Sequence, residues 1–191
     1  MNWLPAYNYI LASKSPRRQE LLSLLGMKFS VKVAEVEENF PEGISKYEIP
    51  EFLARLKSEP LISELRENDL LITADTIVYL DGEVLGKPAN QAEATEMLKK
   101  LSGKEHQVIS GVCLTSTEKQ TSFHAETNVQ FKNLTEDEIR FYIETCKPFD
   151  KAGAYGIQEW IGFIGITHIE GSFYNVMGLP VQQLYQEILN F

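Results

Sequence analysis

The sequence predicts an α/β fold in which helices flank a mixed β-sheet. Apolar residues follow strand-like and helix-like spacing in irregular alternation along the 191 residues. The dipeptide Asp81-Gly82 stands between two apolar segments, which indicates a hairpin and therefore an antiparallel pair of strands. A hydrophobic content of 43% suffices for a substantial core, and we expect a single domain over residues 1–191.

The first elements follow from turn and capping residues. Residues 8–13 have the composition of a short strand, and Ser15 followed by Pro16 is typical of a helix start. Gly26 is the expected stop signal of that helix. Alternating apolar residues then predict a half-buried strand over 29–33.

The middle of the chain continues the alternation. A helix is expected over 49–56, and Pro60 is expected to break or kink it. The apolar stretch 70–80 predicts a buried strand, joined by the hairpin to a short strand at 83–85. Residues 91–101 have helical spacing.

Five further elements complete the prediction. Thr135 and Glu138 form a capping-box pattern that marks the start of a helix. Two long strands are expected over 106–115 and 121–132, and the capped helix is expected over 135–145. A strand over 161–169 and a C-terminal helix from Pro180 onward follow.

Composition limits the classes of partner. The formal net charge of −9 disfavours nucleic-acid polymers and anionic membranes as partners, but a local cationic pocket can still bind a small phosphorylated ligand. No apolar stretch approaches the ~20 residues of a transmembrane helix, and the N-terminus lacks the pattern of a secretory signal. Cys113 and Cys146 lack metal-ligand spacing, so we expect free thiols and a cytoplasmic protein.

Asp75 is the most informative single residue. It interrupts the apolar strand 70–80, where a carboxylate loses water and needs a partner, a metal ion or a catalytic role. A structural ion pair with Lys or Arg explains it about as well as catalysis does. From its position alone, both interpretations stay open.

The helix start Ser15-Pro16-Arg17-Arg18 suggests an anion site. Two cations in the first turn oppose the helix dipole, whereas a bound phosphate would reverse the sign of that interaction. Two solvated arginines on a surface helix are the alternative. The spacing does not decide between them.

Other polar residues are less distinctive by themselves. Lys57 and Lys87 are candidates for a phosphate site, although surface lysines are common, and Glu38 lies in an acidic loop that solvation alone would explain. The segment Asp150–Gln158 is more specific, because its glycines permit close backbone approach and it ends in an amide side chain. It matches neither the dinucleotide-binding nor the P-loop fingerprint.

Taken together, these segments resemble the Maf family of nucleoside triphosphate pyrophosphatases from end to end. The matching segments are LASKSPRRQELL, the Glu37-Glu38 pair, ARLK, TADTIV, GEVLGKP, LSGKEHQVISGV, DKAGAYGIQ and IEGSFYNVMGLP. The segments DKAGAYGIQ and GSFYNVMGLP further resemble the branch of the family that hydrolyses dTTP and UTP.

The resemblance implies a fold, a reaction and an assembly. The fold is a central mixed sheet in two lobes around a deep cleft, like that of inosine triphosphatases, in a protein that is often a homodimer. The reaction cuts a nucleoside triphosphate between its α and β phosphates with Mg²⁺ or Mn²⁺. The implied role is removal of non-standard nucleotides, including modified pyrimidine triphosphates.

The resemblance also assigns site residues. Asp75 matches the proposed general base and Glu38 a metal-associated acid. The phosphate end is implied to include Ser15, Arg17, Arg18, Lys57 and Lys87, and substrate choice is implied to depend on Arg17, Thr76 and Gln158. Two alternatives remain: the sister branch that acts on 7-methyl-GTP, and a nucleotide-binding regulator of septum formation without turnover.

Overall fold

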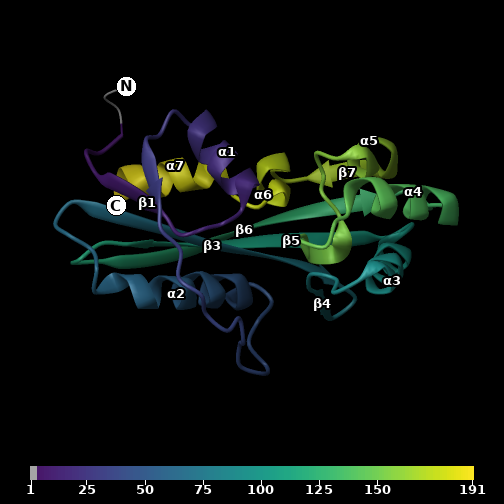
Figure 1. Cartoon of the computed structure of the whole chain (residues 1–191), viewed down its shortest axis with the longest axis horizontal. Coiled ribbons are helices and arrows are strands. Elements are labelled where there is room, and N and C mark those ends of the chain that lie inside the picture. The colour runs from purple at the N-terminus through teal and green to yellow at the C-terminus, as the bar shows by residue number, and fades with distance from the viewer. Residues whose placement is uncertain (1–3) are drawn as a thin grey trace. The chain divides into compact units, whose positions relative to one another are not determined.

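The structure, a computed structural model, describes residues 4–191. Among these residues seven strands form one mixed sheet (Figure 1). The strands are β1 (Asn8–Leu11), β2 (Phe29–Val31), β3 (Asp69–Leu80), β4 (Glu83–Leu85), β5 (Glu105–Thr115), β6 (Gln120–Phe131) and β7 (Ile166–Glu170). Their order is β2-β1-β3-β5-β6-β7, and β4 pairs with β3. β1 is parallel to β2 and β3, whereas β3–β4 and β6–β7 are antiparallel, which confirms the predicted mixed sheet.

The chain forms two compact units. The first comprises the chain up to Asp75, Ser110–Ala125 and Gly178–Phe191, and the second comprises Thr76–Ile109 and Glu126–Met177. The boundaries fall inside β3, β5 and β6, so each of these strands contributes residues to both units.

Three helices belong to the first unit: α1 (Pro16–Leu24), α2 (Glu48–Ile62) and α7 (Val181–Asn190). In Figure 1, α1 and α7 lie on one side of this unit's strands and α2 lies on the other. The predicted start of α1 at Pro16 is confirmed, and Gly26 has the positive φ of 73° that ends the helix.

Pro60 is expected to break or kink the helix, and a break is not observed. α2 runs through Pro60 to Ile62 without interruption. Because Pro60 lies in the last turn, the missing N–H removes one hydrogen bond close to a helix end, where few further bonds depend on it.

The second unit contains the remaining helices of the described chain: α3 (Gln91–Leu101), α4 (Glu136–Cys146), the 3₁₀ turn η1 (Ala152–Ala154), α5 (Trp160–Gly165) and α6 (Phe173–Met177). α3 packs against α4 and η1, and α4 packs against α5. The Thr135–Glu138 capping box is present, and Asp81 and Gly82 both have the positive φ of a tight hairpin.

One expectation for this region is wrong, and one helix was missed. The predicted strand 161–169 is helix α5 up to Gly165 and strand β7 only from Ile166 onward, and helix α6 is not predicted at all. A short apolar run such as Trp160–Gly165 fits a buried helical turn as well as a strand, so periodicity cannot separate them.

His106 is buried in the second unit, and none of the charged residues among 4–191 pairs with it. Its ring stacks on Phe131 at 5.5 Å between ring centroids, and its Nε2 lies 2.7 Å from the hydroxyl of Tyr155. Burial lowers the pKa of His106 to about 4. The folded protein therefore holds a neutral imidazole at pH values where an unfolded chain, with a His pKa of about 6.5, already binds a proton.

This buried imidazole predicts acid sensitivity. Because the folded-state pKa is the lower one, stability is complete above about pH 6.5 and falls as the pH drops toward 4. We expect His106 to account for about 2 kcal/mol of lost unfolding free energy between pH 7 and pH 4.5. Chemical denaturation at both pH values measures this. His106→Gln should flatten the profile, whereas His168→Gln, at an exposed position, should retain it; equal profiles for all three proteins would contradict the assignment.

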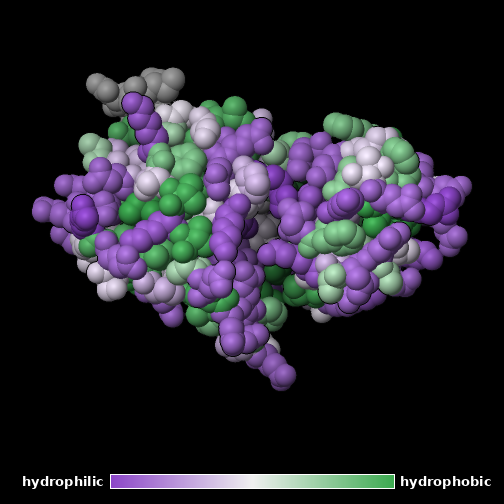
Figure 2. Space-filling view, viewed as in Figure 1, coloured by the Kyte–Doolittle hydropathy of each residue, from purple (hydrophilic) through white to green (hydrophobic). Residues whose placement is uncertain are grey.

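Hydrophilic residues cover much of the face drawn in Figure 2, with smaller apolar areas between them. Within residues 4–191, no helix has both the length and the apolar character needed to cross a membrane.

Candidate functional site

Lys57 joins the two acidic residues singled out by the sequence. Its Nζ lies 2.5 Å from Asp75 Oδ1 and 3.0 Å from Glu38 Oε1. The side chains of Lys57 and Asp75 are only 15% and 10% exposed, so this ion pair is largely shielded from water. Glu38 is 44% exposed and lies on the solvent side of the cluster. The first unit therefore holds a carboxylate–ammonium–carboxylate cluster around Lys57.

The packing of α2 on β3 places Lys57 opposite Asp75. Thr73 donates its hydroxyl hydrogen to the carbonyl oxygen of Ala54 at 2.6 Å. Thr73 and Asp75 share one face of the strand, and Ala54 and Lys57 share one face of the helix. The buried Thr73–Ala54 contact therefore aligns the helix with the strand two strand residues before Asp75 and about one helical turn before Lys57.

Arg18 supports the strand beside Asp75. Its Nη1 donates to the carbonyl oxygen of Ala74 and its Nε to that of Gly178, each at 2.8 Å. Burial lowers the pKa of Arg18, the charge of Arg17 adds to that shift, and the carboxylates of Asp75 and Glu38 oppose it. The bond to Ala74 ties α1 to the residue that precedes Asp75. Two guanidinium donors are thus engaged with the main chain.

The other residues of the helix start lie close to this tether. Ser15 and Arg17 are half-buried at the beginning of α1, and Ser15 donates its backbone N–H to Ser13 Oγ at 3.2 Å. Ser15 occupies the N-cap position, but its side chain makes no capping hydrogen bond. The first unit thus contains six of the predicted site residues, and ion pairs connect three of them directly: Glu38, Lys57 and Asp75.

The donor set fits a hard divalent cation. Such ions prefer oxygen ligands, and Mg²⁺ commonly uses one or two carboxylates together with substrate phosphates. Two carboxylate oxygens already converge on the cationic Nζ of Lys57. No cluster of three His, Cys, Asp or Glu side chains suited to a metal occurs in the described chain, so phosphate oxygens would have to supply further ligands.

The remaining predicted residues belong to the second unit. Thr76 directly follows Asp75 in β3 and therefore points to the opposite face of the strand. Lys87 is exposed, and the preceding residue, Gly86, accepts a hydrogen bond at 3.0 Å from the backbone N–H of Gly153. This bond joins the Lys87 segment to the loop that carries Gln158.

Gln158 has an unsatisfied acceptor. Its Oε1 atom is enclosed by protein and has no hydrogen-bond partner among residues 4–191. A buried carbonyl oxygen without a partner costs roughly 1–3 kcal/mol, and a ligand N–H would recover that energy. The amide is therefore well suited to receive a hydrogen bond from a bound molecule.

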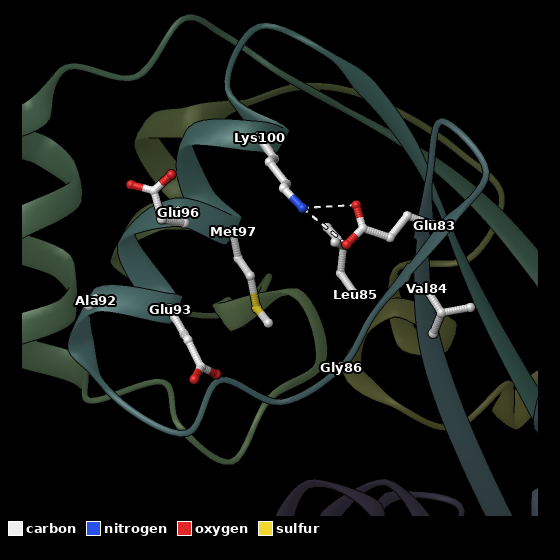
Figure 3. Close-up of a pocket in the computed structure, with 9 residues that line it drawn as sticks. All are labelled: Glu83, Val84, Leu85, Gly86, Ala92, Glu93, Glu96, Met97 and Lys100. Carbon is white, nitrogen blue, oxygen red and sulfur yellow. Dashed lines mark hydrogen bonds and ion pairs between the residues drawn. The ribbon is translucent and has the colours of Figure 1, made fainter. Parts of the chain in front are cut away.

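A separate pocket of about 310 Å³ lies between β4 and α3 (Figure 3). The Lys100 ammonium points toward Glu83 across it, at 2.8 Å from Oε2. An acidic rim disfavours a phosphate ligand. None of the predicted site residues lines this pocket, which is formed by Glu83, Val84, Leu85, Gly86, Ala92, Glu93, Glu96, Met97 and Lys100.

Sequence reasoning missed several residues that support the site. Thr73 and Ser13 are short hydroxyl side chains whose role depends on tertiary contacts. Lys151 and Glu159 lie in or beside the Asp150–Gln158 segment, and the unusual burial of Lys151, only 7% exposed, has no sequence signal beyond its place in that segment.

The chain is similar to known proteins along almost its full length. The family model described as Maf-like protein matches residues 8–191. The chain is similar to two proteins named dTTP/UTP pyrophosphatase, one from Bacteroides thetaiotaomicron and one from Phocaeicola vulgatus. Each is 55% identical over 97% of this chain and 96% of the relative. A protein of the same name from Christiangramia forsetii is 50% identical over 98% of this chain and 97% of its own length.

Among solved structures, the Ham1 protein of Staphylococcus aureus has a TM-score of 0.46 and 18% identity, over 65% of this chain and 71% of that one. The family model covers nearly all of the chain, and the sequence relatives align along almost their full length. The chain therefore belongs to the family of Maf-like proteins.

Proposed function

We propose that this protein hydrolyses dTTP and UTP, and modified pyrimidine triphosphates of the same shape, to the nucleoside monophosphate and pyrophosphate. The observation that carries the proposal is the buried Asp75 carboxylate, held with Glu38 on the ammonium of Lys57. The names of relatives at 50–55% identity support the choice of pyrimidine substrates.

Asp75 is the group we assign to water activation. Its Oδ1 is held by Lys57, and its Oδ2 takes a proton from a water molecule that attacks the α-phosphorus. The new bond joins the water oxygen to that phosphorus, and the bond to the oxygen that bridges to the β-phosphorus breaks. Pyrophosphate leaves with the bonding electron pair. Lys57 also places positive charge where the α-phosphoryl group becomes more negative.

The phosphate end of the substrate is assigned to Ser15, Arg17, Lys57 and Lys87. A triphosphate carries about four negative charges, so several cations and a metal ion are needed to bind it. Arg18 is included for its charge, but its hydrogen bonds to Ala74 and Gly178 favour a role in fixing the helix start beside Asp75.

The metal assignment rests on Glu38. When bound, Mg²⁺ or Mn²⁺ neutralises phosphate charge and orients the triphosphate. Glu38 is the more exposed of the Glu38 and Asp75 carboxylates, which suits a residue that coordinates a metal ion arriving with the substrate. Asp75 lies deeper and is kept for water activation.

Gln158 is assigned to the base. Uracil and thymine present an N3–H donor beside the O4 acceptor, and the enclosed Oε1 of Gln158 can accept from N3–H. Its amide nitrogen can donate to O4 in the same plane. Thr76 and Arg17 are assigned to substrate choice on the family resemblance.

The experiment that tests the reaction measures pyrophosphate and orthophosphate release from a nucleotide panel. The panel contains dTTP, UTP, CTP, GTP, ATP and 7-methyl-GTP, each with Mg²⁺, with Mn²⁺ and with chelator. We expect pyrophosphate from dTTP and UTP, and loss of the activity with chelator. Pyrophosphate formation locates the broken bond between the α and β phosphates.

Other outcomes separate the alternatives. Preferred cleavage of 7-methyl-GTP would assign the protein to the sister specificity, and orthophosphate release would contradict the proposed bond cleavage. Nucleotide binding without turnover would favour the non-catalytic regulator of septum formation.

The single domain over residues 1–191, the homodimer and the cytoplasmic location stay predictions.

A further inference from the structure

The loop that carries Gln158 is closed by a polar network within the second unit. Glu159 occupies the N-cap position of α5, yet its side chain makes no capping hydrogen bond. Its carboxylate instead accepts a hydrogen bond from the Tyr142 hydroxyl and forms an ion pair with Lys151 Nζ at 3.1 Å. The same Lys151 Nζ lies 2.7 Å from Asp150 Oδ1 at the start of the loop.

The network contacts the backbone near Gln158 and links the two ends of the loop. The Tyr142 hydroxyl also accepts a hydrogen bond at 3.0 Å from the backbone N–H of Gly156. Lys151 bridges the two ends of the loop, Asp150 and Glu159, and its side chain is only 8% exposed. The two carboxylates compensate the charge of this buried ammonium.

Tight contacts leave the backbone before Gln158 little freedom. A Cβ on Gly156 would lie 2.9 Å from the Glu159 carboxyl carbon and 3.1 Å from Lys151 Cε. A Cβ on Gly162, in α5, would lie 1.8 Å from the carbonyl oxygen of Ile157. The two residues that precede Gln158 are therefore held by the network on one side and by α5 on the other.

We propose that Glu159, held by Tyr142 and Lys151, is the positioning residue for pyrimidine selection. It holds the backbone beside Gln158 in place, so that only side-chain movement is needed for the enclosed Oε1 to meet the base N3–H. The inference rests on the proposed function, because it assigns the specificity step of that same reaction. Glu159 itself need not touch the substrate.

Burial raises the pKa of Tyr142, and the adjacent Glu159 carboxylate raises it further. Tyr142 thus keeps its proton and remains the donor. Replacing it with phenylalanine removes both the donor to Glu159 and the acceptor for Gly156 N–H, while the ring is retained in the core.

The test compares UTP with N3-methyl-UTP, which lacks the donor to Gln158. In the unmodified protein we expect UTP to be preferred in kcat/KM. Tyr142→Phe should lower this preference about tenfold, mainly through the KM for UTP, because a loosened loop loses one buried hydrogen bond to the base. Glu159→Gln, which can still accept from Tyr142, should produce a smaller loss and provides a second variant if Tyr142→Phe does not fold.

Two controls separate positioning from stability. Tyr155→Phe removes another buried hydroxyl from the same loop, the partner of His106, and should lower Tm without changing the UTP preference. Gln158→Ala should abolish most of the preference, and adding Tyr142→Phe to it should cause little further loss, since both changes act through one contact.

The outcomes distinguish the two proposals. If the unmodified protein releases no pyrophosphate from any nucleotide, the proposed function fails, and the inference fails with it. If it turns over UTP but Tyr142→Phe and Glu159→Gln both keep the full preference over N3-methyl-UTP, the inference alone is overturned.

Discussion

Replacing Asp75 with asparagine is expected to lower kcat for dTTP and UTP by about a thousandfold, the middle of the range for a lost general base. The substitution keeps the shape of the side chain but removes the charge that takes the proton from water. Lys57 keeps Glu38 as an ion-pair partner, so we expect the triphosphate to bind with little change in KM. Steady-state pyrophosphate release gives both constants.

Asp69→Asn is the matched control for this variant. Asp69 is a second buried carboxylate of β3, 8% exposed, and it accepts hydrogen bonds from Asn8 Nδ2 and from the backbone N–H of Arg66. These contacts are structural, so the folded control should keep its kcat. If Asp75→Asn retained kcat within about threefold of the unmodified protein, Asp75 would be removed as the base.

Gly111→Ala is expected to destabilise the protein by about 3 kcal/mol or more, toward the upper end of overpacking effects. A Cβ at this position of β5 would lie 2.2 Å from the carbonyl carbon of Pro50 and 2.3 Å from the backbone nitrogen of Glu51. Both atoms belong to the backbone of α2, so no side-chain rotation can relieve the overlap. The whole helix must move away from the sheet.

Thermal unfolding measures this effect. For a chain of this size, 3 kcal/mol corresponds to a Tm decrease of roughly 6–12 °C. Because α2 also carries Lys57, the folded fraction should lose activity as Lys57 moves relative to Asp75. Gly86→Ala is the control for stability: nothing lies within 4 Å of its added Cβ, and we expect a change within about 0.5 kcal/mol. A Gly111→Ala protein with an unchanged Tm would contradict the close packing of α2 on β5.

Much of the fold could be predicted from local signals. Pro16 and Gly26 mark the ends of the first helix, Asp81-Gly82 marks the hairpin, and the Thr135 capping box marks α4, because each of these depends on the backbone geometry of a few consecutive residues. Local signals failed where tertiary context decides. The run Trp160–Gly165 became a helix, and α2 continued through Pro60.

The candidate site shows the same division. The sequence by itself identified Asp75, since a carboxylate inside an apolar strand is costly and needs a reason. It also indicated Glu38 and Lys57, but nothing in their spacing could show that both Asp75 and Glu38 contact one ammonium group. That contact depends on the alignment of α2 with β3, which is fixed by the buried bond from Thr73 to Ala54.

Sequence thus determined which residue types carry the chemistry, along with the acidic charge balance and most of the element boundaries. Tertiary structure alone decided which of those residues meet. It engaged Arg18 with two backbone carbonyls, and it enclosed Gln158 Oε1 without a hydrogen-bond partner in the described part of the chain. It also buried Lys151 between Asp150 and Glu159. The physical reason is range: capping and turn preferences act over a few residues, whereas ion pairing and burial join groups that are distant in sequence.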